Sequence, residues 1–119
     1  MTRLWLGLFA CGSALALGCQ AAGTAVPTNR LGRTVSFQSE VVPILKNHCA
    51  GCHAVGRPAD VVPMFDRQGA PIHQAIKTHF FHMLAAIEDG TMPRGRPGSV
   101  PAEQYDVLAA WWESGAPNN

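Results

Sequence analysis

The sequence predicts a small all-α domain. Apolar residues recur at spacings of three and four in three separate segments, which is the pattern of amphipathic helices. Proline near the start and glycine just past the end bound the last two of these segments, as is typical of helices. The stretches between the segments are rich in glycine and proline and predict loops. A chain of 119 residues suits one such domain, and we expect three to four helices in it.

The first residues predict an export signal. Arg3 precedes an apolar run from Leu4 to Leu17, which is too short to cross a bilayer because a spanning helix takes about 20 apolar residues. We therefore expect residues 1–19 to be a signal peptide, with a boundary between 18 and 25. The end of the run resembles a lipoprotein processing box, which predicts a lipid on Cys19 and a membrane tether. The alternative is ordinary cleavage near Ala21 and Ala22, and both alternatives predict an exported protein of the bacterial periplasm.

Residues 20–34 read as a flexible linker, and residues 35–119 as the domain itself. Without Arg3 the chain holds eight basic and eight acidic residues, so the exported protein is close to neutral. No basic stripe for nucleic acid is present, and we expect no nucleic-acid partner.

The first helix is expected from Phe37 to Cys49. Ser36 is available as its N-cap, and Glu40 lies near the positively polarised helix start. Pro43 allows two forms, a helix that begins near Glu40 or a longer helix that is kinked at Pro43. The apolar stripe consists of Phe37, Val41, Ile44 or Leu45, and His48.

The second helix is expected between Pro71 and Gly90, after a loop from Val55 to Ala70. Its apolar face consists of Ile72, Ile76, Phe80, Met83, Leu84 and Ile87. The segment Thr91–Ser99 is too rich in glycine and proline to continue this helix.

The third helix is expected to begin at Pro101 and to end before Gly115. Tyr105, Leu108 and Trp112 share one face, with Val107 and Trp111 beside it. We expect this aromatic stripe to pack on the first helix.

The segment Cys49–His53 reads Cys-Ala-Gly-Cys-His, and C-x-x-C-H is the pattern of covalent haem c attachment. On a short helical turn Cys49 and Cys52 lie on one face, so both sulfurs can reach the two vinyl groups along one edge of the macrocycle. A neutral imidazole binds iron through one nitrogen while the other donates a hydrogen bond that fixes the ring. The sequence therefore predicts one haem c per chain, with His53 as the proximal axial ligand of its iron.

The second axial ligand is predicted to be Met92. It lies in the loop Gly90-Thr91-Met92-Pro93, where no helix blocks the approach of the thioether and Pro93 stiffens the backbone. Met64, in a loop with proline, is an alternative, and Met83 reads as core filler. The nitrogen alternatives are His48, His73, His79 and His82, although a helical histidine is more often a surface or hydrogen-bonded residue.

These motifs resemble the class I cytochromes c, in particular bacterial single-haem domains. The likeness covers about Val35 to Pro117, from Val-Pro-Ile-Leu in the first helix through C-x-x-C-H and Gly-Thr-Met-Pro to the closing Trp-x-x-x-Gly-Ala-Pro. The resemblance implies a small cytochrome c fold whose helices wrap around one covalently attached haem. The roles that it implies are thioethers at Cys49 and Cys52, His53 as the proximal ligand and Met92 as the distal ligand.

The resemblance also implies a proline whose carbonyl orients the proximal histidine, and both Pro58 and Pro63 fit that role. The stretch from Pro58 to His82 departs from the family pattern, because that pattern does not require His73, His79 or His82.

The implied function is electron transfer, in which iron cycles between Fe(III) and Fe(II) and redox partner proteins supply and remove the electron. The protein is then a free carrier or a subunit of a larger oxidoreductase, without catalytic residues of its own. Arg94 and Arg96 are expected to neutralise haem propionates, to meet an acidic partner or to lie solvated in their loop. One competing function is a gas-binding or sensing haem protein with an open distal site.

A second competing function is a thiol redox or zinc module, since C-x-x-C is common in both. Zinc normally takes four ligands. A thioredoxin-like site follows a strand, which the segment Val41 to His48 does not offer.

Overall fold

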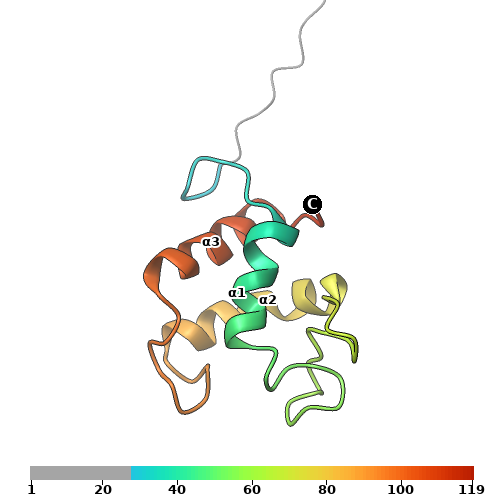
Figure 1. Cartoon of the computed structure of the whole chain (residues 1–119). Helices are drawn as coiled ribbons and strands as arrows, with labels where there is room; N and C mark the ends of the chain where they lie inside the picture. The colour runs from blue at the N-terminus through green and yellow to red at the C-terminus, as the bar shows by residue number, and fades with distance from the viewer. Residues whose placement is uncertain (1–27) are drawn as a thin grey trace, which may run out of the picture.

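The structure, a computed structural model, describes residues 28–119. Three α-helices dominate this range, α1 (Val42–His48), α2 (His73–Glu88) and α3 (Ala102–Glu113), and a π-helical turn, η1 (Phe37–Val41), precedes α1 (Figure 1). The described part of the chain forms no β-strand, only isolated bridges from Phe65 to Ala54 and Pro71. The prediction of a mainly helical domain is therefore confirmed. The predicted signal peptide and residues 20–27 of the linker lie outside the described residues.

The first helical run accommodates Pro43, which lacks an amide hydrogen, with a π-helical turn that the sequence did not indicate. The run extends from Phe37 to His48, and the amides of Val41 and Val42 donate to carbonyls five residues earlier, those of Ser36 and Phe37. From Val42 onward the helix is α-helical, so Pro43 lies in its first turn, where a missing amide hydrogen is tolerated. The expected form with Pro43 in the first turn of the α-helix is therefore the one found, two residues later than Glu40, and the π-helical turn before it was not expected.

Ser36 caps this run as predicted. Its Oγ accepts a hydrogen bond from the Ser39 amide at 3.2 Å, and Glu40 Oε2 accepts one from the Ser36 amide at 2.9 Å. Arg33 pairs with Glu40 at 2.7 Å. The Arg33 guanidinium, and then the Ser36 amide, hold the pKa of the Glu40 carboxyl below its ordinary value.

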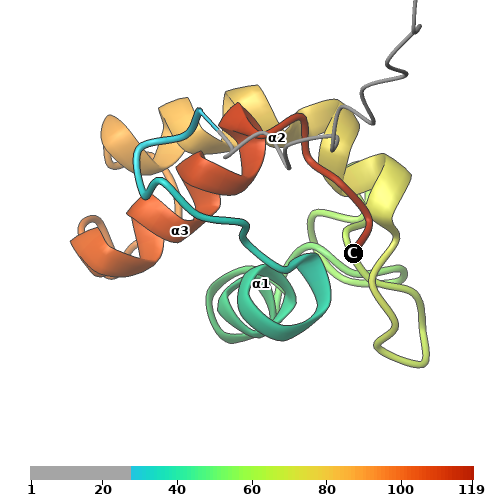
Figure 2. The same cartoon turned by 90° about the horizontal axis from the view of Figure 1, so that it is seen from above.

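α2 and α3 end close to where the sequence predicts. α3 packs against both η1 and α2. Figure 2 shows α1 nearly end-on, beside α2 and α3. The segments 55–70 and 91–99 are loops, as expected, and both lie toward the end of the molecule where α1 finishes (Figure 1). No helix among residues 28–119 is long and apolar enough to span a membrane.

Trp111 is the centre of the core, where its side chain is fully buried. Its ring stacks on Phe37 at a centroid distance of 5.2 Å and meets Phe80 edge-on at 4.7 Å. Trp112, which the sequence placed on the packing face, is only half-buried and stacks on Phe80 at 5.9 Å. The third helix does contact the first helical run, but through Trp111, which stacks on Phe37. The buried residues of α3 are Leu108, Ala109, Ala110 and Trp111.

His73 belongs to this aromatic core. Its ring meets the Phe37 ring edge-on at 4.8 Å, and its Nε2 hydrogen-bonds to the Ala116 carbonyl at 3.0 Å. We refer to Phe37, His73, Phe80 and Trp111 as the aromatic cluster. The unusual histidine at the start of α2 therefore has a structural role.

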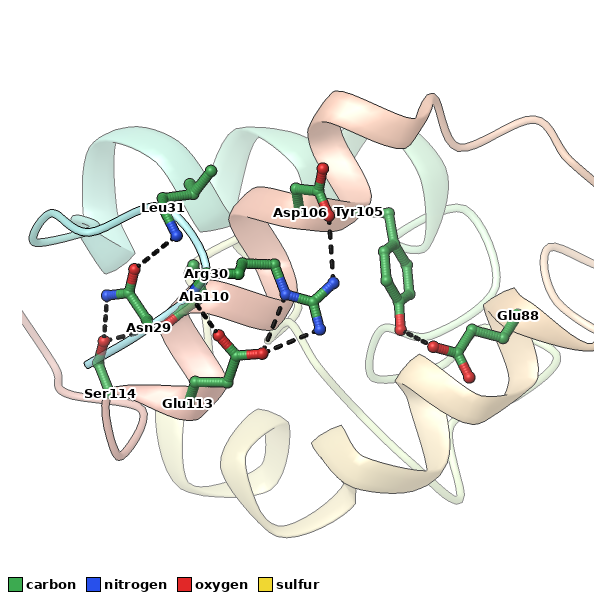
Figure 3. A network of polar contacts seen from close by, with 9 residues as sticks. All are labelled: Asn29, Arg30, Leu31, Glu88, Tyr105, Asp106, Ala110, Glu113 and Ser114. Atoms are coloured by element: carbon green, nitrogen blue, oxygen red, sulfur yellow. Dashed lines mark hydrogen bonds and ion pairs between the residues drawn. The ribbon is translucent and has the colours of Figure 1, made fainter. Parts of the chain in front are cut away.

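The last residues of the predicted linker lie against α3 (Figure 3). Arg30 forms ion pairs with Glu113 at 2.9 Å and with Asp106 at 3.1 Å, and its guanidinium lies 5.5 Å from the centre of the Tyr105 ring. Asn29 Nδ2 donates to Ser114 Oγ at 2.7 Å. Residues 29–33 thus form a turn that polar contacts attach to the outer side of α3.

Candidate functional site

The four predicted site residues line one cavity. Its volume is about 330 Å³, and its walls come from the end of α1, the loop that follows and the loop between α2 and α3. Cys49, Cys52 and His53 reach it from the first two segments, and Met92 reaches it from the third. The remaining lining residues are His48, Pro58, Ala59, Pro93, Arg94 and Arg96.

The Cys49–His53 segment forms a helical turn that continues directly from α1. The Cys49 amide donates to the Leu45 carbonyl at 2.8 Å, and the His53 amide donates to the Cys49 carbonyl at 2.9 Å. Residues three apart in such a turn lie on one side. Cys49 is half-buried and Cys52 is exposed, so the second sulfur lies at the mouth of the cavity.

The His53 ring is held from behind by a backbone carbonyl. Its Nδ1 lies 3.3 Å from the carbonyl oxygen of Val62, and the backbone of the same loop is attached through the Met64 amide, which donates to the His53 carbonyl at 2.8 Å. A carbonyl can only accept, so Nδ1 is the donor in this contact, and in a neutral imidazole Nε2 then keeps its lone pair. This is the arrangement that a metal-binding imidazole requires.

The acceptor differs from the one that the resemblance implies. It is neither Pro58 nor Pro63 but Val62, the residue immediately before Pro63. A residue that precedes proline is restricted to extended backbone. The position before Pro63 was therefore the feature of the sequence that could have pointed to Val62 as the acceptor.

Met92 lies in a tight turn directly after α2. Its amide donates to the Ala86 carbonyl at 3.0 Å, and Gly90 has a φ of 79°, which allows the chain to reverse. Asp89 Oδ1 accepts hydrogen bonds from the Thr91 hydroxyl and amide, and these bonds lower the pKa of the Asp89 carboxyl. The turn holds Met92 beside the cavity.

A smaller cavity of about 40 Å³ is lined by all three candidate methionines, Met64, Met83 and Met92, and also by Cys49 and His53. Met92 and Pro93 line both cavities, whereas Met64 and Met83 line only the smaller one. Met64 and Met83 are 4% and 9% exposed and belong to the hydrophobic core, as predicted for Met83. Among these three methionines, only Met92 reaches the cavity that holds both cysteines.

The four alternative histidines also differ in whether they line these cavities. His48 lines both cavities, but its Nε2 is engaged with Gln104 Oε1 of α3 at 2.8 Å. Its Nδ1 is buried without a hydrogen-bond partner among residues 28–119. His73 belongs to the aromatic cluster, and His79 and His82 line neither cavity.

The residues around the larger cavity fit a haem c. Two thiols three positions apart, an imidazole with a free Nε2 and a thioether sulfur are the groups that attach and ligate such a cofactor. The volume of about 330 Å³ falls in the range of ligand pockets, roughly 300–1,000 Å³. Arg94 and Arg96 add positive charge at the rim, where anionic substituents of a macrocycle can be neutralised.

The thiol chemistry does not favour a dithiol redox centre. Burial, and then the neighbouring Cys52, raise the pKa of the Cys49 thiol to about 11. Redox-active cysteines have the opposite shift, because the thiolate is the nucleophile. No group of three or more His, Cys, Asp or Glu side chains within residues 28–119 is arranged to hold a metal ion.

No family model, curated protein or solved structure matches this chain. The resemblance to class I cytochromes c therefore rests on the motifs of the sequence and on the residues that line the cavity.

Proposed function

We propose that this protein carries one covalently attached haem c and transfers electrons between redox partner proteins in the bacterial periplasm. One observation carries the proposal: Met92 lines the same cavity as Cys49, Cys52 and His53, although a loop and a whole helix lie between them in the sequence. A C-x-x-C-H segment alone is also compatible with other chemistry. A thioether on the same cavity would give an iron that His53 binds a second axial ligand.

Each of the four residues has a distinct role. The thiols of Cys49 and Cys52 would hold the haem, each by adding across one vinyl group to form a thioether with no leaving group. His53 offers Nε2 while the Val62 carbonyl holds its Nδ1 hydrogen. Met92 offers its sulfur from a turn that is anchored on α2. When bound, haem supplies an iron that takes up and releases one electron.

Met92 decides between electron transfer and ligand chemistry. A thioether ligand favours the ferrous state more than a second histidine does and so raises the reduction potential. It also occupies the position that a gas molecule would need. The hydrogen bond from the Met92 amide to the Ala86 carbonyl holds the backbone of Met92 in place. This supports a fixed distal ligand, and hence an electron carrier.

Arg94 and Arg96 are suited to bind the haem propionates. Both line the cavity, and guanidinium groups pair with carboxylates through two parallel hydrogen bonds. The exposure of Cys52 leaves the attachment edge accessible, which suits the approach of a redox partner.

The first test is covalent attachment. The full chain is exported in a bacterial host that matures c-type cytochromes, and haem staining is measured on a reducing denaturing gel together with the intact mass. We expect one haem per chain in the wild type and loss of stable staining in Cys49→Ala with Cys52→Ala. Colourless protein with both thiols free to alkylate would contradict the proposal. The same mass reports whether Cys19 carries lipid or cleavage occurs near Ala22.

The second test is the distal ligand. Met92→Ala should abolish the weak far-red absorption band of ferric iron bound to thioether sulfur, while Met64→Leu and Met83→Leu keep core volume and should preserve the band. If Met92→Ala leaves the spectrum unchanged, the distal site is open and gas binding becomes the better hypothesis. Loss of the band in Met64→Leu alone would identify Met64 as the ligand.

A further inference from the structure

A second cavity lies on the other side of the Cys49–His53 segment. Its volume is about 310 Å³, and it shares no lining residue with the cavity described above. The two cavities are separated by the helical turn that carries the cysteines. The lining residues are Lys46, Ala50, Ala54, Val55, Arg57, Phe65, Asp66, Arg67, Gln68 and Gly69.

The charges around this cavity are predominantly positive. Lys46, Arg57 and Arg67 line it, against a single carboxylate, Asp66. All ion pairs between residues 28 and 119 involve Arg30 or Arg33, so none of these three cations has a carboxylate oxygen within 4.0 Å. All three are exposed, and several cations around one hollow raise the local concentration of anions there.

Asp66 offsets at most one of these three charges, and its Oδ1 is engaged by its own turn. Asp66 Oδ1 accepts hydrogen bonds from the Gln68 amide at 2.9 Å and from the Ala70 amide at 2.8 Å. This carboxylate therefore shapes the loop that carries Arg67.

The walls are preorganised by backbone hydrogen bonds. The Val55 amide donates to the Phe65 carbonyl at 2.9 Å and joins the two loops that carry Arg57 and Arg67. The Arg57 amide donates to the Ala54 carbonyl at 3.0 Å, and the Asp66 amide donates to the Ala70 carbonyl at 2.9 Å. Binding of a ligand here costs little backbone entropy, because only the long side chains must become ordered.

We propose that this cavity binds a small multivalent oxyanion, a molecule with two or more carboxylate or phosphate groups. The volume accommodates a small molecule. Two arginines and a lysine match two or three negative charges, and arginine binds both carboxylates and phosphates through its planar fork. The proposed function uses none of these three cations, so this site stands independently of haem attachment.

The test is calorimetric titration of the exported, matured protein with citrate and, separately, with pyrophosphate, at constant ionic strength set with sodium chloride. We expect one site per chain, and the stronger of the two probes identifies carboxylate or phosphate as the preferred group. Lys46→Gln, Arg57→Gln and Arg67→Gln should each weaken binding about threefold or more, since each removes one charge contact.

The matched control is Lys77→Gln. Lys77 is exposed on α2, lines no part of this cavity and has no ion pair, so its replacement should leave the affinity unchanged. Equal weakening by Lys77→Gln would mean that binding follows net charge alone, and this would overturn the proposal. Absence of binding of both probes at millimolar concentration would overturn it as well. Circular dichroism of each variant separates a lost contact from a lost fold.

Discussion

The aromatic cluster and the cavity that Cys49, Cys52, His53 and Met92 line are at the two ends of the same helical run, which begins at Phe37 and leads into Cys49. At the first end, Phe37, Phe80 and Trp111 fill the space between η1, α2 and α3 with their own rings. At the second end the chain leaves a cavity of about 330 Å³ and covers it with loops. One end is filled by side chains, and the other holds a cavity lined by Cys49, Cys52, His53 and Met92.

The basic side chains also differ between the two ends of this helical run. Near the first end, Arg30 and Arg33 are paired with carboxylates of α3 and η1. Near the second end, Arg94 and Arg96 line one cavity, and Lys46, Arg57 and Arg67 line the other. None of these five has an ion-pair partner within residues 28–119. A protein with near-neutral net charge thus presents most of its uncompensated positive charge where ligands are proposed to bind.

The largest expected effect is on the aromatic cluster. Trp111→Ala should lower the free energy of unfolding by about 3–5 kcal/mol, because it leaves a cavity between Phe37 and Phe80. Denaturant unfolding measures this loss. The matched variant is Trp112→Ala, which should cost clearly less because Trp112 is only half-buried. If Trp112→Ala were the more damaging of the two, Trp111 would not be the centre of the core.

A smaller effect is expected in the turn that holds Met92. Gly90→Ala should destabilise the protein by about 1–2 kcal/mol, because φ at Gly90 is 79° and an added Cβ meets Pro97 Cβ at 3.3 Å. It should also weaken the far-red band, since the turn positions the thioether. Gly51→Ala is the control, because its added Cβ meets no atom within 4 Å and its φ is not in the left-handed region. Equal destabilisation by both variants would show that turn strain is not the cause.

The charged attachment of residues 29–33 should matter less. Arg30→Ala removes two exposed ion pairs and a contact with the Tyr105 ring, and we expect a loss below about 1 kcal/mol. The loss should shrink further in 1 M salt, which screens charges beyond about 3 Å. Thermal unfolding at low and high salt measures both. A loss that is large and independent of salt would mean that Arg30 acts through packing.

The smallest effect at neutral pH concerns Tyr105, the only tyrosine of the chain. Burial, and then its hydrogen bond to Glu88, raise the pKa of Tyr105 from 10.0 to about 12. The folded pKa exceeds the unfolded one, so the resulting stabilisation is complete below pH 10 and is lost as the pH rises toward 12. Ultraviolet titration of the phenolate measures this pKa. Glu88→Gln should lower the pKa of Tyr105 only part of the way toward 10.0, because burial remains. A Tyr105 pKa near 10.0 in the wild type would contradict the effect of burial.

Much of the local structure was readable from the sequence. The bounds of α2 and α3 followed from apolar spacing and from proline and glycine at their ends, since these signals act within a few residues. The cap at Ser36 followed for the same reason. The form of the helix around Pro43 did not, because a π-helical turn satisfies the backbone without a distinctive residue pattern.

The sequence by itself determined which segments are helical and which residues carry the chemistry of the C-x-x-C-H segment, because helix periodicity and motif spacing are properties of neighbouring residues. Only the tertiary structure decided that Trp111 rather than Trp112 is central, that Val62 supplies the carbonyl behind His53, and that His73 belongs to the core. It also decided that Lys46, Arg57 and Arg67 surround one hollow. The contacts of Trp111 and His73 depend on residues that are far apart in the chain and meet only when the helices pack, whereas the contact of Val62 with His53 and the second cavity depend on how the loop after α1 folds back.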